Sequence, residues 1–296
     1  MLTAMLLWFV MASAGGVAQS ADSTTIILLG TGTPRPDPAS AGPATAVVFG
    51  SRVFLFDAGT GVVRRMAAAK LPVTGPTAVF ITHLHSDHTL GYPDLILTTW
   101  VVGRTKPLEA YGPHGLKAMT DHILAAWSED IAVRTTGLEH ESPDAYAVHV
   151  HEISPGVVYD SAGVKITAIP VLHGSWKEAY GYRIDTPDRS IVISGDTRPA
   201  PALEAAARGV DVLIHEVHPE DGAGPGRPAT AEWLQYLREF HTSDVELGRI
   251  AAAANPKMLV LYHFGARETA SDRVVAAIQR AGYKGRILVG RDLDRF

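Results

Sequence analysis

The chain of 296 residues contains no cysteine, which excludes disulfide bonds, thiolate metal sites and a cysteine nucleophile. It also lacks an excess of positive charge. The net charge of −5 argues against a dedicated nucleic-acid-binding protein. With 46% hydrophobic and 19% charged residues, the composition excludes a disordered chain, and a core can form without metals or disulfides.

Long apolar runs are missing beyond the N-terminus. Residues Met1–Val10 form one such run, and the small-residue segment Ala12–Ala18 follows it, a pattern typical of a signal peptide. No lysine or arginine precedes Arg35, and an uncleaved membrane anchor is the alternative. We expect residues 1–20 to be a cleaved signal peptide, and residues 21–296 to form a single domain in the periplasm or outside the cell, with no membrane contact after cleavage.

The remaining chain alternates short apolar, β-branched strands with helices and contains no long linker, which is typical of a layered α/β domain. The predicted strands are 25–30, 44–49, 53–57, 78–82, 108–111, 146–153, 164–171, 191–194, 212–215 and 258–262. The predicted helices are 62–69, 114–127, 201–208, 229–240, 245–254 and 271–281.

Four potential metal ligands lie within six residues, directly after the predicted strand 78–82. His83 and His85 are two residues apart in an extended segment, so their side chains point the same way and can bind one ion. Asp87 and His88 follow across a turn and cannot easily reach that ion. This geometry predicts two neighbouring metals, which at about 4 Å can share a hydroxide and hold an ester from both sides.

Residues Thr82–His88 read Thr-His-Leu-His-Ser-Asp-His, and the chain resembles the metallo-β-lactamase fold superfamily, whose signature is Thr-His-x-His-x-Asp-His. The resemblance spans about residues 25–289 and implies an α/β fold, the four-layer αββα metallo-β-lactamase sandwich. It also implies that Asp57 supports the metal loop from behind. The ligands it implies are His83, His85 and His173 for the first metal, Asp87, His88 and His263 for the second, and Asp196 as a bridge. Zinc is the default ion for such ligands, and iron or manganese would also fit.

Within this superfamily the chain is similar to the ribonuclease Z and arylsulfatase branch. The motifs that carry this similarity are Gly30–Pro34, Gly181–Arg183, Gly195–Pro199 and Phe240–Ser243. Bacterial ribonuclease Z enzymes carry a long tRNA-binding arm between the second and third of these motifs, where this chain has only residues 184–194. Together with the predicted export and the negative charge, the missing arm makes tRNA processing the weaker interpretation and argues against a nucleic-acid partner.

A further histidine is a candidate for catalysis. His241 precedes the capping-box pattern of Ser243 and Glu246, and the positive potential at a helix start lowers the pKa of a histidine. The resemblance gives the matching histidine a role in stabilising the transition state or protonating the leaving group. We expect Glu216 to orient His241 and Asp87 or Asp196 to orient the nucleophile.

Two other pairs of residues are weaker candidates. His149 and His151 lie on one face of the predicted strand 146–153 without an accompanying acidic motif, so we interpret them as structural or exposed. Trp100 and Trp176 could line a substrate pocket or pack in the core.

The sequence thus predicts an exported hydrolase with two divalent metal ions, which cleaves a phosphodiester or aryl sulfate in a small-molecule substrate. A hydroxide shared by the metals would attack the ester. One alternative is a ribonuclease Z-like endoribonuclease that processes the 3′ ends of tRNA. The other is a non-catalytic binding module, which the complete ligand set disfavours. A homodimer is also compatible with the sequence.

Overall fold

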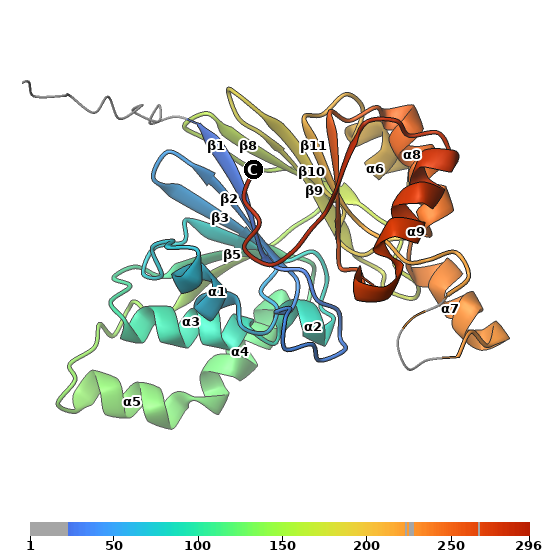
Figure 1. Cartoon of the computed structure of the whole chain (residues 1–296). Coiled ribbons are helices and arrows are strands. Elements are labelled where there is room, and N and C mark those ends of the chain that lie inside the picture. The colour runs from blue at the N-terminus through green and yellow to red at the C-terminus, as the bar shows by residue number, and fades with distance from the viewer. Residues whose placement is uncertain (1–22, 223, 225–227, 266) are drawn as a thin grey trace, which may run out of the picture.

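The computed structural model describes residues 23–222, 224, 228–265 and 267–296, so the predicted signal peptide lies outside the described residues. Two β-sheets face each other, and helices cover the outer side of each sheet (Figure 1). This architecture confirms the predicted four-layer α/β sandwich. Across the described ranges, no helix is long and apolar enough to cross a membrane.

The first sheet has the strand order β1-β2-β3-β4-β5-β6. Its first three strands are antiparallel and the others run parallel to β3. The strands are β1 (Thr24–Gly30), β2 (Ala44–Phe49), β3 (Arg52–Phe56), β4 (Ala78–Phe80), β5 (Leu108–Gly112) and β6 (Val148–Glu152). The helices inserted between them are α1 (Val62–Ala68), α2 (Ser86–Thr89), α3 (Tyr92–Val101), α4 (Leu116–Ala126) and α5 (Ser128–Thr136).

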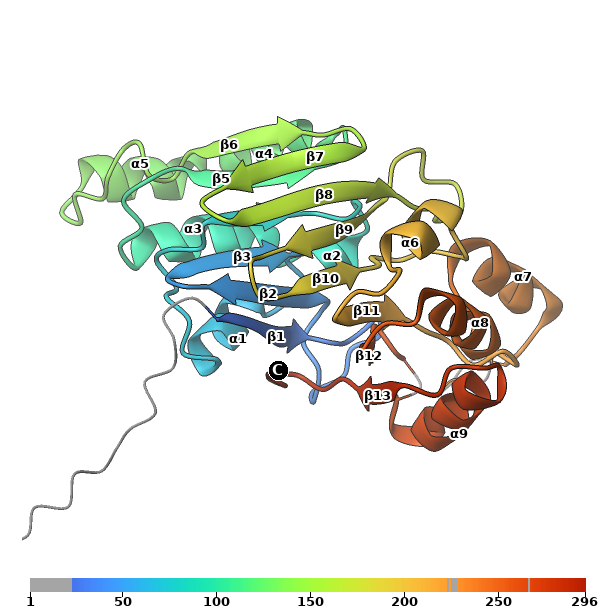
Figure 2. The same ribbon diagram turned by 90° about the horizontal axis from the view of Figure 1, so that it is seen from above.

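The second sheet has the order β13-β12-β11-β10-β9-β8-β7 (Figure 2). Strands β7 to β10 are antiparallel, and β10 to β13 are parallel. The strands are β7 (Gly156–Ser161), β8 (Val164–Pro170), β9 (Tyr180–Asp185), β10 (Ser190–Ile193), β11 (Val212–Glu216), β12 (Met258–Tyr262) and β13 (Arg286–Val289). The helices of this half are α6 (Pro201–Ala206), α7 (Ala231–Phe240), α8 (Asp244–Ala254) and α9 (Arg267–Arg280).

Strand β1 shows why its sequence is a continuous apolar run. Ile26 and Leu28 point into the core between the two sheets, while Ile27 and Leu29 point into the core beneath the first helix layer. Successive side chains of a strand point to opposite faces, and both faces of β1 are buried. The layered packing follows from this pattern.

The end of the chain returns to the first sheet. Phe296 exchanges backbone hydrogen bonds with Ile26, and the Leu28 amide donates to the carbonyl oxygen of Asp294. This segment covers β1, which lies at the edge of its sheet and would otherwise leave backbone groups unpaired. It also joins the two halves, because it follows β13 directly.

Candidate metal centre

The histidine motif is held in place by a carboxylate behind it. Asp57 directly follows β3, is 2% exposed, and accepts hydrogen bonds from the Thr82 amide at 2.8 Å and the Thr82 hydroxyl at 3.0 Å. It also accepts a bond from Nδ1 of His88 at 2.8 Å, which leaves Nε2 of His88 free to bind a metal. The position of Asp57 agrees with the supporting role that the resemblance implied.

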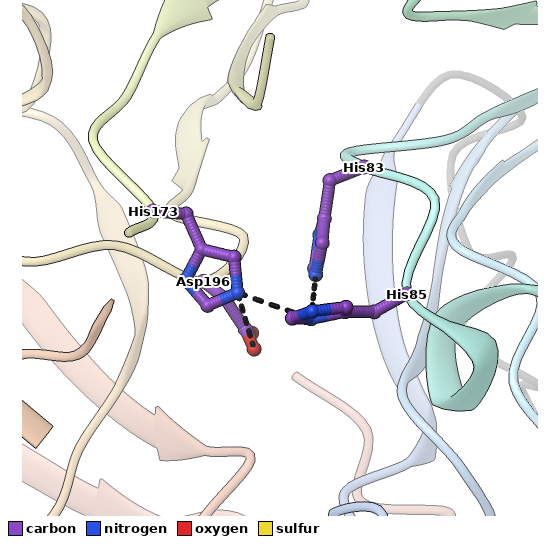
Figure 3. A group of neighbouring side chains, drawn as sticks. All are labelled: His83, His85, His173 and Asp196. Atoms are coloured by element: carbon purple, nitrogen blue, oxygen red, sulfur yellow. Dashed lines mark hydrogen bonds and ion pairs between the residues drawn. The ribbon is translucent and has the colours of Figure 1, made fainter. Parts of the chain in front are cut away.

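Four side chains meet in a first group, which comprises His83, His85, His173 and Asp196 (Figure 3). Nδ1 of His85 lies 2.9 Å from Nε2 of His83 and 3.1 Å from Nε2 of His173. Oδ2 of Asp196 lies 4.0 Å from Nε2 of His173. One potential ligand atom from each of the four residues lies within 4.8 Å of the others, so these atoms can surround one ion.

A second group lies beside the first and comprises Asp87, His88 and His263. Oδ2 of Asp87 lies 3.1 Å from Nε2 of His263 and 3.6 Å from Nε2 of His88. Asp196 reaches this group as well, with Oδ1 3.3 Å from His88 and Oδ2 3.6 Å from His263. The Asp196 carboxylate therefore lies between the two groups. The structure brings together the seven residues that the sequence singled out as ligands.

The donor atoms of this centre fit two metal ions. Nε2 of His88 and Oδ1 of Asp196 are buried and lie 3.3 Å apart as an ion pair, but neither atom forms a well-aligned hydrogen bond among the described residues. An unpartnered buried polar atom is costly, and a bound cation removes that cost. His173 donates from Nδ1 to the Phe240 carbonyl oxygen at 2.8 Å, so its Nε2 is free to bind a metal. The two His/Asp groups therefore fit a dinuclear metal site.

The electrostatics of the two groups differ. Burial lowers the pKa of His83 well below its usual range and that of His173 to about 4, so both rings are neutral, the state that binds metals. In the second group, burial would lower the pKa of His88, but Asp196 and Asp57 outweigh it and raise this pKa. For Asp196, burial would raise the pKa, but His263 and His88 hold it well below its usual range. In the metal-free protein the second group is thus a set of paired charges.

His241 lies beside this centre, in the short connection between α7 and α8. Its Nδ1 lies 3.0 Å from both carboxylate oxygens of Glu216, whose Oε1 also accepts a hydrogen bond from the Thr197 amide at 2.7 Å. The neighbouring Thr242 hydroxyl donates to the Thr197 carbonyl oxygen, which joins this connection to the loop of Asp196. Glu216 therefore lies where it can orient His241.

The helix start that follows His241 has the predicted capping box. Ser243 accepts a hydrogen bond from the Glu246 amide, and the Glu246 carboxylate accepts one from the Ser243 amide. The pKa of His241 is lowered to about 4, but the main cause is burial of the ring rather than the helix end.

A cavity of about 630 Å³ opens over the metal ligands. Asp87, Asp196, His241 and His263 line it on the side of the metal centre. Apolar and aromatic groups form much of the remaining wall, among them Val217, Trp233, Tyr236, Leu237 and Phe264. Nothing in the sequence indicated that Trp233, Tyr236 and Leu237 of α7 line the cavity. His218 also lines it and was not indicated either.

The weaker candidates fall in different places. His149 and His151 are exposed and donate to the two carboxylate oxygens of Glu109 at 2.8 and 2.7 Å, apart from both metal groups. Trp100 is fully buried in the core, whereas the indole nitrogen of Trp176 lies 2.8 Å from Nε2 of His85. Of the two tryptophans, Trp176 therefore lies beside the metal centre.

Comparison with known proteins agrees with this fold and site. Residues 52–264 match the family described as "Beta-lactamase superfamily domain". The chain belongs to the metallo-β-lactamase superfamily, and it is a metal-dependent hydrolase. It is similar to Ribonuclease Z of Mycobacterium marinum, with 36% identity over 278 residues that cover 91% of this chain and 97% of that protein. Ribonuclease Z of Mycobacterium sp. strain KMS is 38% identical over 244 residues, which cover 81% of this chain and 83% of that protein.

Solved structures resemble the fold at lower identity. The short form of human tRNase Z superposes with a TM-score of 0.67 and 22% identity, over 92% of this chain and 98% of that chain. The metallo-β-lactamase fold protein YhfI from Bacillus subtilis superposes with a TM-score of 0.71 and 17% identity, over the same shares of both chains. These likenesses support the shared fold.

The relatives correct one argument drawn from the sequence. The missing arm made tRNA processing the weaker interpretation, but the alignment to the Mycobacterium marinum protein covers 97% of that protein without an insertion of arm length. A short connection at residues 184–194 is therefore compatible with a protein named Ribonuclease Z. The absence of an arm does not argue against tRNA as a substrate.

Proposed function

We propose that this protein is an endoribonuclease of the ribonuclease Z type, which hydrolyses a phosphodiester bond at the 3′ side of tRNA precursors. The main support is the 36% identity that extends over 97% of a protein named Ribonuclease Z. The complete set of ligand residues supports turnover rather than binding alone.

In this proposal the protein uses two divalent metal ions as cofactors, most simply two zinc ions, which the two His/Asp groups bind. When bound, such ions lower the pKa of a shared water and polarise the phosphoryl oxygens. The ions also matter for the charge of the cavity, because Asp87 and Asp196, whose pKa values burial would raise but neighbouring histidines lower, line it and would repel a phosphodiester. Two divalent cations reverse the sign of this potential.

The chain's own groups then position the reactants. Asp87 and Asp196 face the same cavity and can accept hydrogen bonds from the attacking water. His241 lies on the cavity wall and is fixed by Glu216, whose own pKa is raised well above its usual range by burial and by Asp196. A protonated Glu216 donates to Nδ1 of the neutral ring, so the ring proton is on Nε2, which can donate a hydrogen bond to the anion that develops as the ester breaks. Glu216 acts through His241, because its oxygens are occupied by His241 and the Thr197 amide.

The test is cleavage of a tRNA precursor that carries a 3′ trailer, by zinc-loaded protein and by the His263→Ala variant. We expect a single cut at the mature 3′ end with the wild-type protein, and greatly reduced cleavage with the variant, which lacks a ligand of the second group. Intact precursor after incubation with the fully loaded wild-type protein, under conditions in which a small phosphodiester is hydrolysed, would refute the tRNA substrate.

A second candidate is the hydrolysis of a small aryl ester. The apolar wall formed by Val217, Trp233, Leu237 and Phe264 favours it, because such a wall suits an aromatic leaving group. Parallel assays with 4-nitrophenyl sulfate and bis(4-nitrophenyl) phosphate separate the two candidates. An efficiency on either ester far above that on the tRNA precursor would favour the aryl ester.

A further inference from the structure

A hydroxyl group extends the pair of Glu216 and His241 into the cavity. On one edge of the His241 ring, Nδ1 faces the Glu216 carboxylate at 3.0 Å. On the opposite edge, Nε2 lies 3.3 Å from the hydroxyl oxygen of Tyr236. Both Tyr236 and His241 line the cavity that contains the metal ligands.

The ring of Tyr236 is held by its neighbours on α7. It stacks on Trp233 with ring centroids 5.1 Å apart and on Phe240 with centroids 4.5 Å apart. The three residues lie on one helix face, because residues three and four apart are neighbours on a helix surface. Phe240 in turn packs edge-on against the ligand His173, with centroids at 5.1 Å. The stack thus fixes the hydroxyl of Tyr236 relative to the metal centre.

We propose that Tyr236 is a further catalytic residue, whose hydroxyl donates a hydrogen bond to the leaving oxygen of the ester. This proposal rests on the ester hydrolysis of the proposed function. Because Nε2 of His241 and the Tyr236 hydroxyl are 3.3 Å apart, a substrate oxygen that approaches one comes within reach of the other. The two groups together can stabilise the charge that develops on that oxygen.

The proposal specifies which substrates depend on Tyr236. An alkoxide, such as the ribose oxygen released from a polynucleotide, leaves with nearly a full negative charge and needs a hydrogen-bond donor. A 4-nitrophenolate is a stable anion and leaves without such help. Tyr236 therefore matters most for esters with poor leaving groups.

The experiment compares the wild-type protein with Tyr236→Phe, which removes only the hydroxyl and keeps the aromatic stack. Both proteins are loaded with zinc. The substrates are phosphodiesters that share one phosphoryl group and differ in the leaving group, from 4-nitrophenol through phenol to an alkyl alcohol. We expect kcat to fall about 10- to 100-fold for the alkyl ester and to be nearly unchanged for the 4-nitrophenyl ester, with KM little affected. Tyr146→Phe is the control, since Tyr146 packs on Trp100, away from the cavity.

Each other outcome has a defined meaning. Equal losses for all leaving groups would overturn the proposal, because they indicate a packing role for the hydroxyl. An unchanged kcat for the alkyl ester would also overturn it. Because the series contains no tRNA, wild-type protein that cleaves these esters but not a tRNA precursor would refute the tRNA substrate alone. Wild-type protein that cleaves neither these esters nor a tRNA precursor would refute both proposals.

Discussion

Replacement of Asp57 by asparagine tests how the metal centre is supported. Asp57 contacts no metal position itself, but its two oxygens accept three hydrogen bonds, from the Thr82 amide, the Thr82 hydroxyl and Nδ1 of His88. An asparagine keeps one acceptor oxygen and turns an amide group with two N–H donors toward the remaining donors. Whichever way the amide is turned, Asp57→Asn leaves at least one donor facing another donor.

The magnitude follows from the burial of these groups. A charge-assisted hydrogen bond in a buried site contributes about 1.5–3 kcal/mol, and its loss at a group that orients a metal ligand lowers metal affinity about 10- to 100-fold. We expect the unfolding free energy of the metal-free protein to fall by about 2–3 kcal/mol, because an unsatisfied buried donor remains. Competition with a zinc chelator measures the affinity, and urea denaturation measures the stability.

The matched control is Asp188→Asn in the turn between β9 and β10. Asp188 also accepts hydrogen bonds from the amide and the hydroxyl of one threonine, Thr24, but it touches no metal ligand. We expect Asp188→Asn to keep the wild-type zinc affinity, and Asp57→Asn to regain most of its kcat once it is saturated with zinc. A wild-type affinity in Asp57→Asn would refute the argument that Asp57 orients His88.

Three further predictions address the metal ligands, the catalytic role of His241 and the pH dependence of the stability. His83→Ala and His263→Ala should each lower a content of about two metal equivalents, and full occupancy in both variants, measured by elemental analysis, would contradict the ligand assignment. His241→Ala should lower kcat about 10²- to 10⁴-fold with the metal content preserved, and loss of metal instead would make His241 a ligand or its support. Burial would raise the pKa of Asp211, but hydrogen bonds from Lys257 and Ser190 lower it to about 2. The ionised form of Asp211 therefore stabilises the fold above about pH 4, and this contribution is lost as the pH falls toward 2. Because Lys257 is largely exposed, we expect Asp211→Asn to cost about 1 kcal/mol in urea denaturation at pH 7, a difference that should shrink below pH 4.

The metal centre was predictable because its ligands follow the ends of strands. His83, Asp196 and His263 each come one to three residues after the parallel strands β4, β10 and β12. The carboxyl ends of parallel strands meet at one edge of a sheet, and here the edges of both sheets adjoin. The spacing of the residues within the motif 82–88 indicated two metals by geometry, whereas the distant ligands depended on the resemblance to a family.

The strand and helix pattern was predictable where side chains are uniformly apolar. Each predicted strand overlaps an observed one, and the two-residue turn between β2 and β3 is as expected. Strands β7, β9 and β13 were missed because they are polar, short or interrupted by a glycine, and their pairing is decided by neighbours distant in sequence. Helix α3 was missed because of Pro93. The first turn of a helix tolerates a proline, because the N–H group that proline lacks would have no partner within the helix there.

The cavity wall could not be predicted in this way. Trp233, Tyr236 and Leu237 have the helical spacing of ordinary packing residues, and nothing in that spacing distinguishes a core face from a substrate wall. Their relation to His241 depends on how α7 ends against the loop of His173, where the Gly174 amide donates to the Glu239 carbonyl oxygen. This contact joins positions more than sixty residues apart, so only the folded chain reveals it.

The location of the protein decides between the two candidate functions, because tRNA precursors lie inside the cell. Export is predicted from the apolar run Met1–Val10 and the small-residue segment Ala12–Ala18. The N-terminal segment lacks the positive charge of an ordinary signal peptide, and it lies outside the described residues. Mass spectrometry of the protein from separated cell fractions tests it. A mature chain that begins near Gln19 or Ala21 in the exported fraction would confirm the signal peptide, and would turn the apolar cavity wall into an argument for an aryl ester. Full-length protein confined to the cytoplasm would refute the export and leave the tRNA precursor as the substrate that both location and relatives favour.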